Sequence, residues 1–279
     1  MNVDGLRTFS ALLWKEIKEA KVKFLTALVA FLLLGLFGVL LLYWLPDLLP
    51  PEILIPIHFT AAEAFQNTIG DLVQTGTLIA ALISMDVVAG ERHRKTLDLL
   101  LVRPVSRVSI ITAKFISRAG IVFVAVIAAA IPTWYYTTYL FGELSFFLAI
   151  QATAFIALEL VFASALTMTF SIVAKTEYVA AISGIVVSVF FASISILAEP
   201  WSKITPYHYV DTLKVLNGTM EAATYWQNLT TILGFIAAIF ILCVLLFSSA
   251  SIQKAMRSLV HEKKRKEPHR TSLTKSKNR

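Results

Sequence analysis

Charged residues are scarce in this chain. Of its 279 residues, 15% are Asp, Glu, Lys or Arg, while 57% are hydrophobic and the mean hydropathy is +0.73. Soluble domains carry about 25% charged residues. Several uncharged apolar runs reach about 20 residues, which is the length that crosses a bilayer. A soluble fold could not bury so many such runs, so the sequence indicates a membrane protein with several spans.

Disulfide, metal and catalytic motifs are also missing. The single Cys243 excludes an intrachain disulfide, and the five histidines are scattered with no H-E-x-x-H pair for zinc. No G-x-x-x-x-G-K-[ST] phosphate-binding loop and no G-x-S-x-G nucleophile motif occurs. We therefore expect neither an enzyme nor a cofactor or metal bound by this chain.

The apolar runs predict an all-α membrane protein with six transmembrane helices. Turn and charge signals place these spans at residues 24–45, 68–88, 116–137, 147–173, 178–198 and 228–250. Tyr and Trp residues lie at several ends of the predicted spans that have few Lys and Arg residues nearby. This position is typical of aromatic rings at the level of the lipid headgroups. We expect residues 24–250 to form one six-span domain.

Lys and Arg are distributed unequally between the two sides of these spans. One side carries 23 of the 25 basic residues, and the other carries only Lys203 and Lys214. Because cytoplasmic loops are enriched in Lys and Arg, the pattern predicts that both termini face the cytoplasm. The same distribution explains the net charge of +7, so this charge does not call for a nucleic-acid partner, and we expect none. We expect a multi-pass protein of the cell membrane.

Three segments outside the spans have their own predicted structure. Apolar residues recur every three or four positions in residues 6–24, so the segment 1–23 is expected to form an amphipathic helix in the cytoplasmic headgroup plane. A basic flank that only sets topology is the alternative. Residues 199–227 are too polar to span and predict short outer helices between spans five and six. The basic stretch 251–279 is predicted to be a disordered cytoplasmic tail.

Glu159 is the ionisable residue that lies well inside a predicted span, the fourth. A charge at the bilayer centre costs about 2.5–3.5 kcal/mol on insertion scales, so this side chain should face the bundle interior, a wet cavity or a partner. Two interpretations remain. Glu159 is a candidate residue of the translocation path, or it is a neutral, hydrogen-bonded carboxyl that helps the helices pack.

Residues 86–118 combine positive charge with an apolar run. The basic residues are Arg92, Arg94, Lys95, Arg103, Arg107, Lys114 and Arg118. They surround the Leu-Leu-Leu-Val run at 99–102, and residues 94–102 can form a short helix that ends before Pro104. An apolar ridge with flanking charges suits docking on another protein. An ordinary basic loop that sets topology is the alternative.

The spacing within this segment resembles the permease subunits of type-2, export-type ABC transporters. The matching residues are Glu91, Thr96, Leu97, Asp98, Leu99, Leu100, Pro104, Ser106, Arg107 and Lys114. Lys95 and Ala113 depart from the pattern, since glycine is common at both positions. The resemblance implies that the residues from Glu91 to Arg107 include a coupling helix that docks in a groove of a separate ATP-hydrolysing subunit.

The same resemblance implies a function. It makes the chain the membrane subunit of an ATP-driven transporter, with export as the usual direction and a second copy or a similar permease completing the path. ATP and magnesium would then bind the partner ATPase rather than this chain. An ATP-independent secondary carrier or channel is the alternative, and internal repeats or broken mid-span helices would favour it. The sequence does not identify the substrate.

Overall fold

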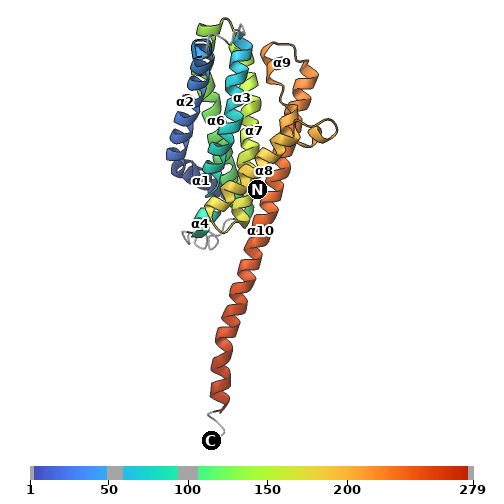
Figure 1. The fold of residues 1–279 in the computed structure, drawn as a ribbon. Coiled ribbons are helices and arrows are strands. Elements are labelled where there is room, and N and C mark those ends of the chain that lie inside the picture. Colours follow the sequence, from blue (N-terminus) through green and yellow to red (C-terminus); the bar gives the residue numbers. More distant parts are fainter. Residues whose placement is uncertain (1–2, 49–58, 94–105, 276–279) are drawn as a thin grey trace.

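The computed structural model describes residues 3–48, 59–93 and 106–275, with only the backbone for residues 3–6, 8 and 250–275. Every regular element in these ranges is a helix (Figure 1). The α-helices are α1 (Val3–Glu19), α2 (Lys21–Leu48), α3 (Ala61–Ser84), α4 (Ala89–His93), α6 (Arg107–Phe141), α7 (Phe146–Val173), α8 (Glu177–Ile194), α9 (Thr212–Leu216) and α10 (Ala222–Lys275). The predicted all-α class is confirmed.

Six helical segments in the described ranges are long and apolar enough to cross a membrane. They are Lys21–Leu48, Ala61–His93, Arg107–Phe141, Phe146–Val173, Glu177–Ile194 and Ala222–Ser249. The prediction of six spans is confirmed, and their orientation in the membrane stays a prediction. Several helices extend past the predicted ends because polar residues cap them. Thr60 and Glu63 form a capping box at the start of α3, and Ser106 Oγ accepts a hydrogen bond from the Ser109 backbone N–H at 3.0 Å at the start of α6.

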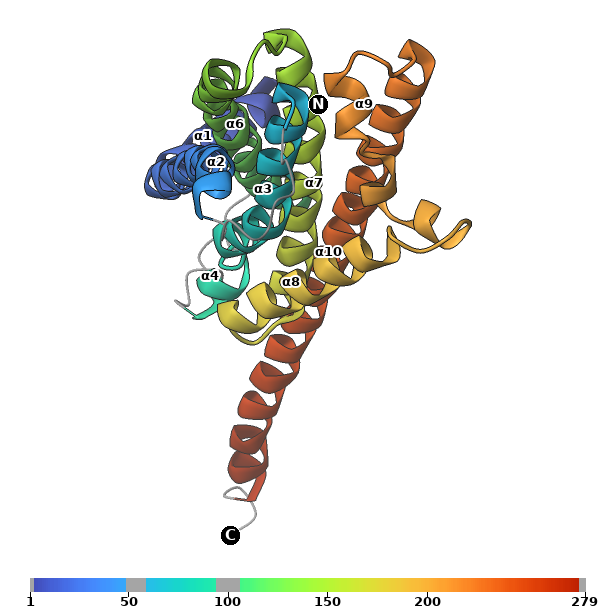
Figure 2. The same ribbon diagram turned by 45° about the horizontal axis from the view of Figure 1, so that its top comes forward.

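Helix α7 lies at the centre of the bundle. It packs against α3, α6, α8 and α10 (Figures 1 and 2). The side chains of residues 159–169 are all buried. Close helix approach depends on small residues here. A Cβ added at Gly184 of α8 would lie 2.1 Å from Thr167 Oγ1 of α7, so only glycine allows this contact. The centre of the fold is therefore set by a helix that is apolar on every side.

Helix α1 lies across the end of the bundle that carries α4 (Figure 1). Its apolar face, which includes Phe9 and Leu12, packs on Ile110 and Ala113 of α6, while Trp14 remains exposed. A turn at residue 20 then leads into α2. The amphipathic N-terminal helix is thus present, and its position in the headgroup plane stays a prediction.

Short helices connect α8 to α10, as predicted. They are the 3-10 helices η1 (Trp201–Ile204) and η2 (Pro206–Tyr209), followed by α9. Helix α9 lies at the end of the bundle opposite to α4 (Figure 1). The connection also packs against the bundle, because Val215 and Leu216 of α9 are buried in the main apolar core.

Helix α10 extends far beyond the bundle and ends at Lys275 (Figure 1). A helix that has already formed in the membrane elongates at little cost, because the unfavourable nucleation step is complete. The disordered tail predicted for residues 251–279 stays a prediction.

Candidate functional site

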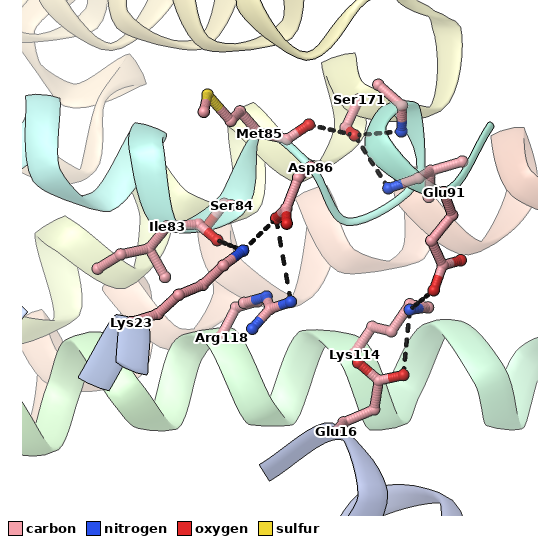
Figure 3. A network of polar contacts seen from close by, with 12 residues as sticks. Glu16, Lys23, Ile83, Ser84, Met85, Asp86, Glu91, Lys114, Arg118 and Ser171 are labelled. Carbon is pink, nitrogen blue, oxygen red and sulfur yellow. Dashed lines mark hydrogen bonds and ion pairs between the residues drawn. The ribbon is translucent and has the colours of Figure 1, made fainter. Parts of the chain in front are cut away.

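Six charged side chains meet where α1, α2 and α6 surround the segment from the end of α3 to α4. They are Glu16, Lys23, Asp86, Glu91, Lys114 and Arg118, and we refer to them as the basal network (Figure 3). Three are acidic and three are basic, so the network is formally neutral. It lies at the end of the bundle where α3–α4 and α6 are joined by residues 94–105.

Lys114 of α6 is the centre of one half of the basal network. Its Nζ atom lies 3.1 Å from Glu16 Oε1 of α1 and 2.6 Å from Glu91 Oε1 of α4. The Lys114 side chain is 4% exposed and that of Glu16 is 1% exposed. Removing one partner of a buried ion pair leaves an uncompensated charge and costs about 3–5 kcal/mol. Lys114 therefore holds α1, α4 and α6 together.

Asp86 is the centre of the other half. It lies in the turn between α3 and α4, and Lys23 Nζ of α2 donates a hydrogen bond to its Oδ1 atom. Lys23 Nζ also donates to the Ile83 carbonyl oxygen at 3.4 Å. Arg118 Nη2 of α6 lies 3.9 Å from the same Asp86 oxygen. Two cations from different helices thus share one carboxylate.

The two halves are aligned by helix geometry. Lys114 and Arg118 are four residues apart and so lie on the same face of α6. Asp86 and Glu91 follow one another along the opposing segment in the reverse direction, so that Asp86 faces Arg118 and Glu91 faces Lys114 (Figure 3). The basal network therefore joins the two chain segments that enter and leave residues 94–105.

Helix α4 is also fixed to the end of α7. Ser171 Oγ accepts hydrogen bonds from the backbone N–H groups of Val88, at 3.1 Å, and Ala89, at 2.9 Å, and donates to the Met85 carbonyl at 2.7 Å (Figure 3). Arg92 Nη1 donates to the Ala174 carbonyl at 2.8 Å. The Ser171 bonds satisfy backbone groups that the turn between α3 and α4 leaves without helical partners, and the Arg92 bond satisfies a carbonyl at the C-terminal end of α7. The start of the connection is consequently attached to the central helix of the bundle.

The predicted coupling residues fall into two groups. Glu91 is part of the basal network, Ser106 caps α6, and Arg107 Nη1 donates to the Ser248 carbonyl of α10 at 3.4 Å. The remaining predicted residues are Thr96, Leu97, Asp98, Leu99, Leu100 and Pro104, and they lie outside the residues that the structure describes. Their role in docking stays a prediction.

Sequence reasoning missed most of the basal network. Glu16 and Lys23 fall in the predicted amphipathic segment 1–23 and Asp86 falls at the end of the predicted second span, and none of them was assigned a partner from the sequence. The available signal was the four-residue spacing of Lys114 and Arg118 opposite two acids on the other side of the same connection. That signal is visible only if the two spans are assumed to pair closely.

Glu159 lies near the middle of α7 and is 3% exposed. Within the described part of the chain, no ion pair or hydrogen bond to its carboxyl group is present, and Tyr207 of η2 is close enough for an electrostatic interaction. The carboxyl faces the interior of the bundle, as its predicted cost in lipid requires. Its role in a translocation path stays a prediction. The described residues contain no group of three His, Cys, Asp or Glu side chains that could hold a metal ion.

A comparison with protein families complements this geometry. Residues 10–252 match the model of the ABC-2 family transporter protein, so the match includes most of α1, the five spans that follow and the membrane part of α10. A comparison with curated proteins gives no match. The match covers most of the chain and agrees with the six spans and with the resemblance of the segment after the second span. The chain therefore belongs to the ABC-2 family of transporter proteins, as a membrane-spanning permease subunit.

Proposed function

We propose that this permease works as part of an ATP-driven exporter and that residues 91–107 couple it to separate ABC-type ATPase subunits. The observation that supports this proposal is the basal network, which joins both ends of the connection 94–105 to α1, α2 and α6. A connection that served only to link two spans would not need four buried or half-buried ion pairs at its base.

The network suggests how force would pass from the ATPase to the membrane helices. Movement of the connection would displace Glu91 and Asp86, and through them Lys114, Arg118 and Lys23 on two spans. Because breaking a buried pair costs about 3–5 kcal/mol, the pairs favour movement of the helices together as a rigid body. Ser171 and Arg92 would transmit the same movement to α7.

A second copy of the chain, or a similar permease, would complete the translocation path. Helices α8 and α10 support this part of the proposal because only 22% and 17%, respectively, of their most apolar membrane segments is buried in the single chain. ATP and magnesium would bind the ATPase partner, whereas this chain would contribute no nucleotide site. The assembly would reside in the cell membrane, with the basal network on the cytoplasmic side.

Co-purification tests this function. The full chain, solubilised in detergent from cells that express its native partners, should bring down an ABC-type ATPase and ATP-hydrolysing activity. Leu99→Asp places a charge on the predicted docking ridge and should abolish both. Lys214→Asp adds negative charge at the opposite, exposed end of the bundle and should leave both unchanged.

The competing function, an ATP-independent carrier or channel, predicts a different result. Transport into inverted membrane vesicles would then continue without ATP and would be unaffected by Leu99→Asp. That outcome, together with no recovered ATPase, would refute the proposed coupling.

A further inference from the structure

Helix α1 has a second face, opposite to the face that packs on α6. Arg7, Trp14 and Lys18 occupy positions i, i+7 and i+11, which lie on one side of an α-helix. All three side chains are exposed, and we refer to them as the outer stripe. Glu16, in contrast, is buried and pairs with Lys114 of α6. Helix α1 is therefore attached to the bundle by one face and presents two cations and an indole ring on the other.

The outer stripe is positively charged. Between its two cations the sequence contains one acidic residue, Glu16, which is buried on the opposite face. The next acidic residue, Glu19, pairs with Lys15 at 3.4 Å. Lys18 Nζ lies 5.3 Å from the centroid of the Trp14 ring, a distance at which the ring attracts the cation. Among the side chains that the structure describes, neither cation of the stripe forms an ion pair, so an anionic group is the complement that this surface lacks.

Helix α2, at the outer edge of the bundle, indicates the depth at which the outer stripe lies (Figures 1 and 2). Large exposed apolar side chains recur along one side of this helix, at Val22, Leu25, Val29, Leu33, Phe37, Leu41 and Trp44. This apolar side extends for about 33 Å, at about 1.5 Å per residue, and so matches the hydrocarbon thickness of about 30 Å. Val22 then marks the level at which the hydrocarbon ends. Helix α1, which ends at Glu19, lies just outside it, at the level of the headgroups.

From this charge and depth we propose that the outer stripe binds the headgroups of anionic phospholipids. Lys and Arg beside a membrane attract the anionic lipids of the cytoplasmic leaflet, and Trp is enriched at the level of the headgroups. Arg7 and Lys18 stand about 16 Å apart along the helix, at about 1.5 Å per residue, so they would contact different headgroups, with Trp14 between them. Such binding depends on the cytoplasmic placement of this end of the bundle under the proposed function, but it requires no ATPase.

Quenching of Trp14 fluorescence by brominated lipids tests this binding. The full chain is placed in phosphatidylcholine nanodiscs that contain increasing fractions of brominated phosphatidylglycerol or, in a parallel series, of brominated phosphatidylcholine. Subtracting the fluorescence of Trp14→Phe isolates the signal of Trp14 from that of the other tryptophans. Half-maximal quenching should require about fivefold less of the anionic lipid, which corresponds to about 1 kcal/mol for one basic residue at the surface. Salt at about 1 M should remove this difference, because it shortens the Debye length to about 3 Å.

Two charge-matched double variants complete the test. Arg7→Gln combined with Lys18→Gln should make the two brominated lipids equally effective. Lys203→Gln combined with Lys214→Gln removes the same charge from the connection between α8 and α10 and should leave the fivefold preference unchanged.

Three results would overturn the lipid site. They are no quenching of Trp14 by either lipid, equal quenching by both in the unmodified chain, and loss of quenching when an ATPase subunit binds, which would identify a protein as the occupant. A lipid preference without ATPase co-purification would preserve this site and refute the proposed coupling. Co-purification without a lipid preference would do the opposite.

Discussion

Lys114 Nζ lies 2.6 Å from Glu91 Oε1, and these two residues stand on either side of the connection between the second and third spans. The pair is largely removed from solvent, with side-chain exposures of 4% and 18%. Glu16 of α1 shares the same ammonium group. A residue of the N-terminal helix is thus linked directly to the segment that resembles the ATPase-docking element of related permeases.

Replacing Lys114 by Met should strongly destabilise the protein. The change leaves Glu16 and Glu91 without their shared counter-ion in a buried site, for which the expected loss is about 3–5 kcal/mol. The measurement is the thermal unfolding of the full chain in detergent, followed by a fluorescence or aggregation assay. Lys15→Met is the control, because the exposed Lys15–Glu19 pair should contribute no more than about 1 kcal/mol. Equal unfolding temperatures for the two variants would contradict the assignment.

Lys23 and Arg118 should differ in their coupling to Asp86. Lys23 donates a hydrogen bond to the carboxylate, whereas Arg118 approaches only to 3.9 Å, and its Nε and Nη1 atoms have no hydrogen-bond partner in the described ranges. Two double-mutant cycles, which combine Asp86→Asn with Lys23→Met or with Arg118→Met, measure the coupling energies. Values within about 0.5–3 kcal/mol are expected, with the larger for Lys23. A larger coupling for Arg118 would mean that it is the principal partner of Asp86.

Gly184→Ala should separate α7 from α8. The added Cβ would lie 2.1 Å from Thr167 Oγ1 and 2.8 Å from Thr167 Cα, and the backbone atom cannot move without shifting the helix. Overpacking of this kind costs about 1–3 kcal/mol. Gly234→Ala of α10 is the matched control, because nothing lies within 4 Å of its added Cβ. The control should unfold at the same temperature as the unmodified chain or slightly higher, since alanine favours helix over glycine by about 1 kcal/mol.

Tyr207 should make the stability of the fold sensitive to alkaline pH. Burial raises its pKa in the folded state, whereas unfolding restores the ordinary value of 10.0. A raised folded pKa contributes stability that is fully present below pH 10 and is lost as the pH rises toward the folded value. The unfolding temperature should therefore fall less steeply between about pH 9 and 11 in Tyr207→Phe than in the unmodified chain. Identical pH profiles would show that the tyrosine does not titrate differently in the two states.

Secondary structure and span number were accessible from the sequence because they depend on local properties. A run of about 20 apolar residues must form a helix in a bilayer, where backbone groups have no water to bind. The outer helices before α10 followed from proline and glycine punctuation.

The candidate site was only partly predictable. Glu91, Ser106 and Arg107 were identified through the resemblance of their segment to known permeases. Lys23, Asp86 and Arg118 were not, because an ion pair between helices depends on their rotation and depth, which hydropathy does not report. The same holds for Ser171, whose hydroxyl group binds backbone atoms of a different span.

By itself, the sequence determined that this chain is an all-α membrane protein with six spans and that its second connection resembles a coupling element. These properties follow from lengths, charges and spacings along the chain. Only the tertiary structure decided which charges meet, since Glu16 and Lys114 are far apart in sequence and share a contact solely because α1 packs on α6. It also decided that Glu159 is buried inside the bundle and interacts electrostatically with Tyr207, because burial and electrostatic contact depend on how whole helices pack rather than on any local motif.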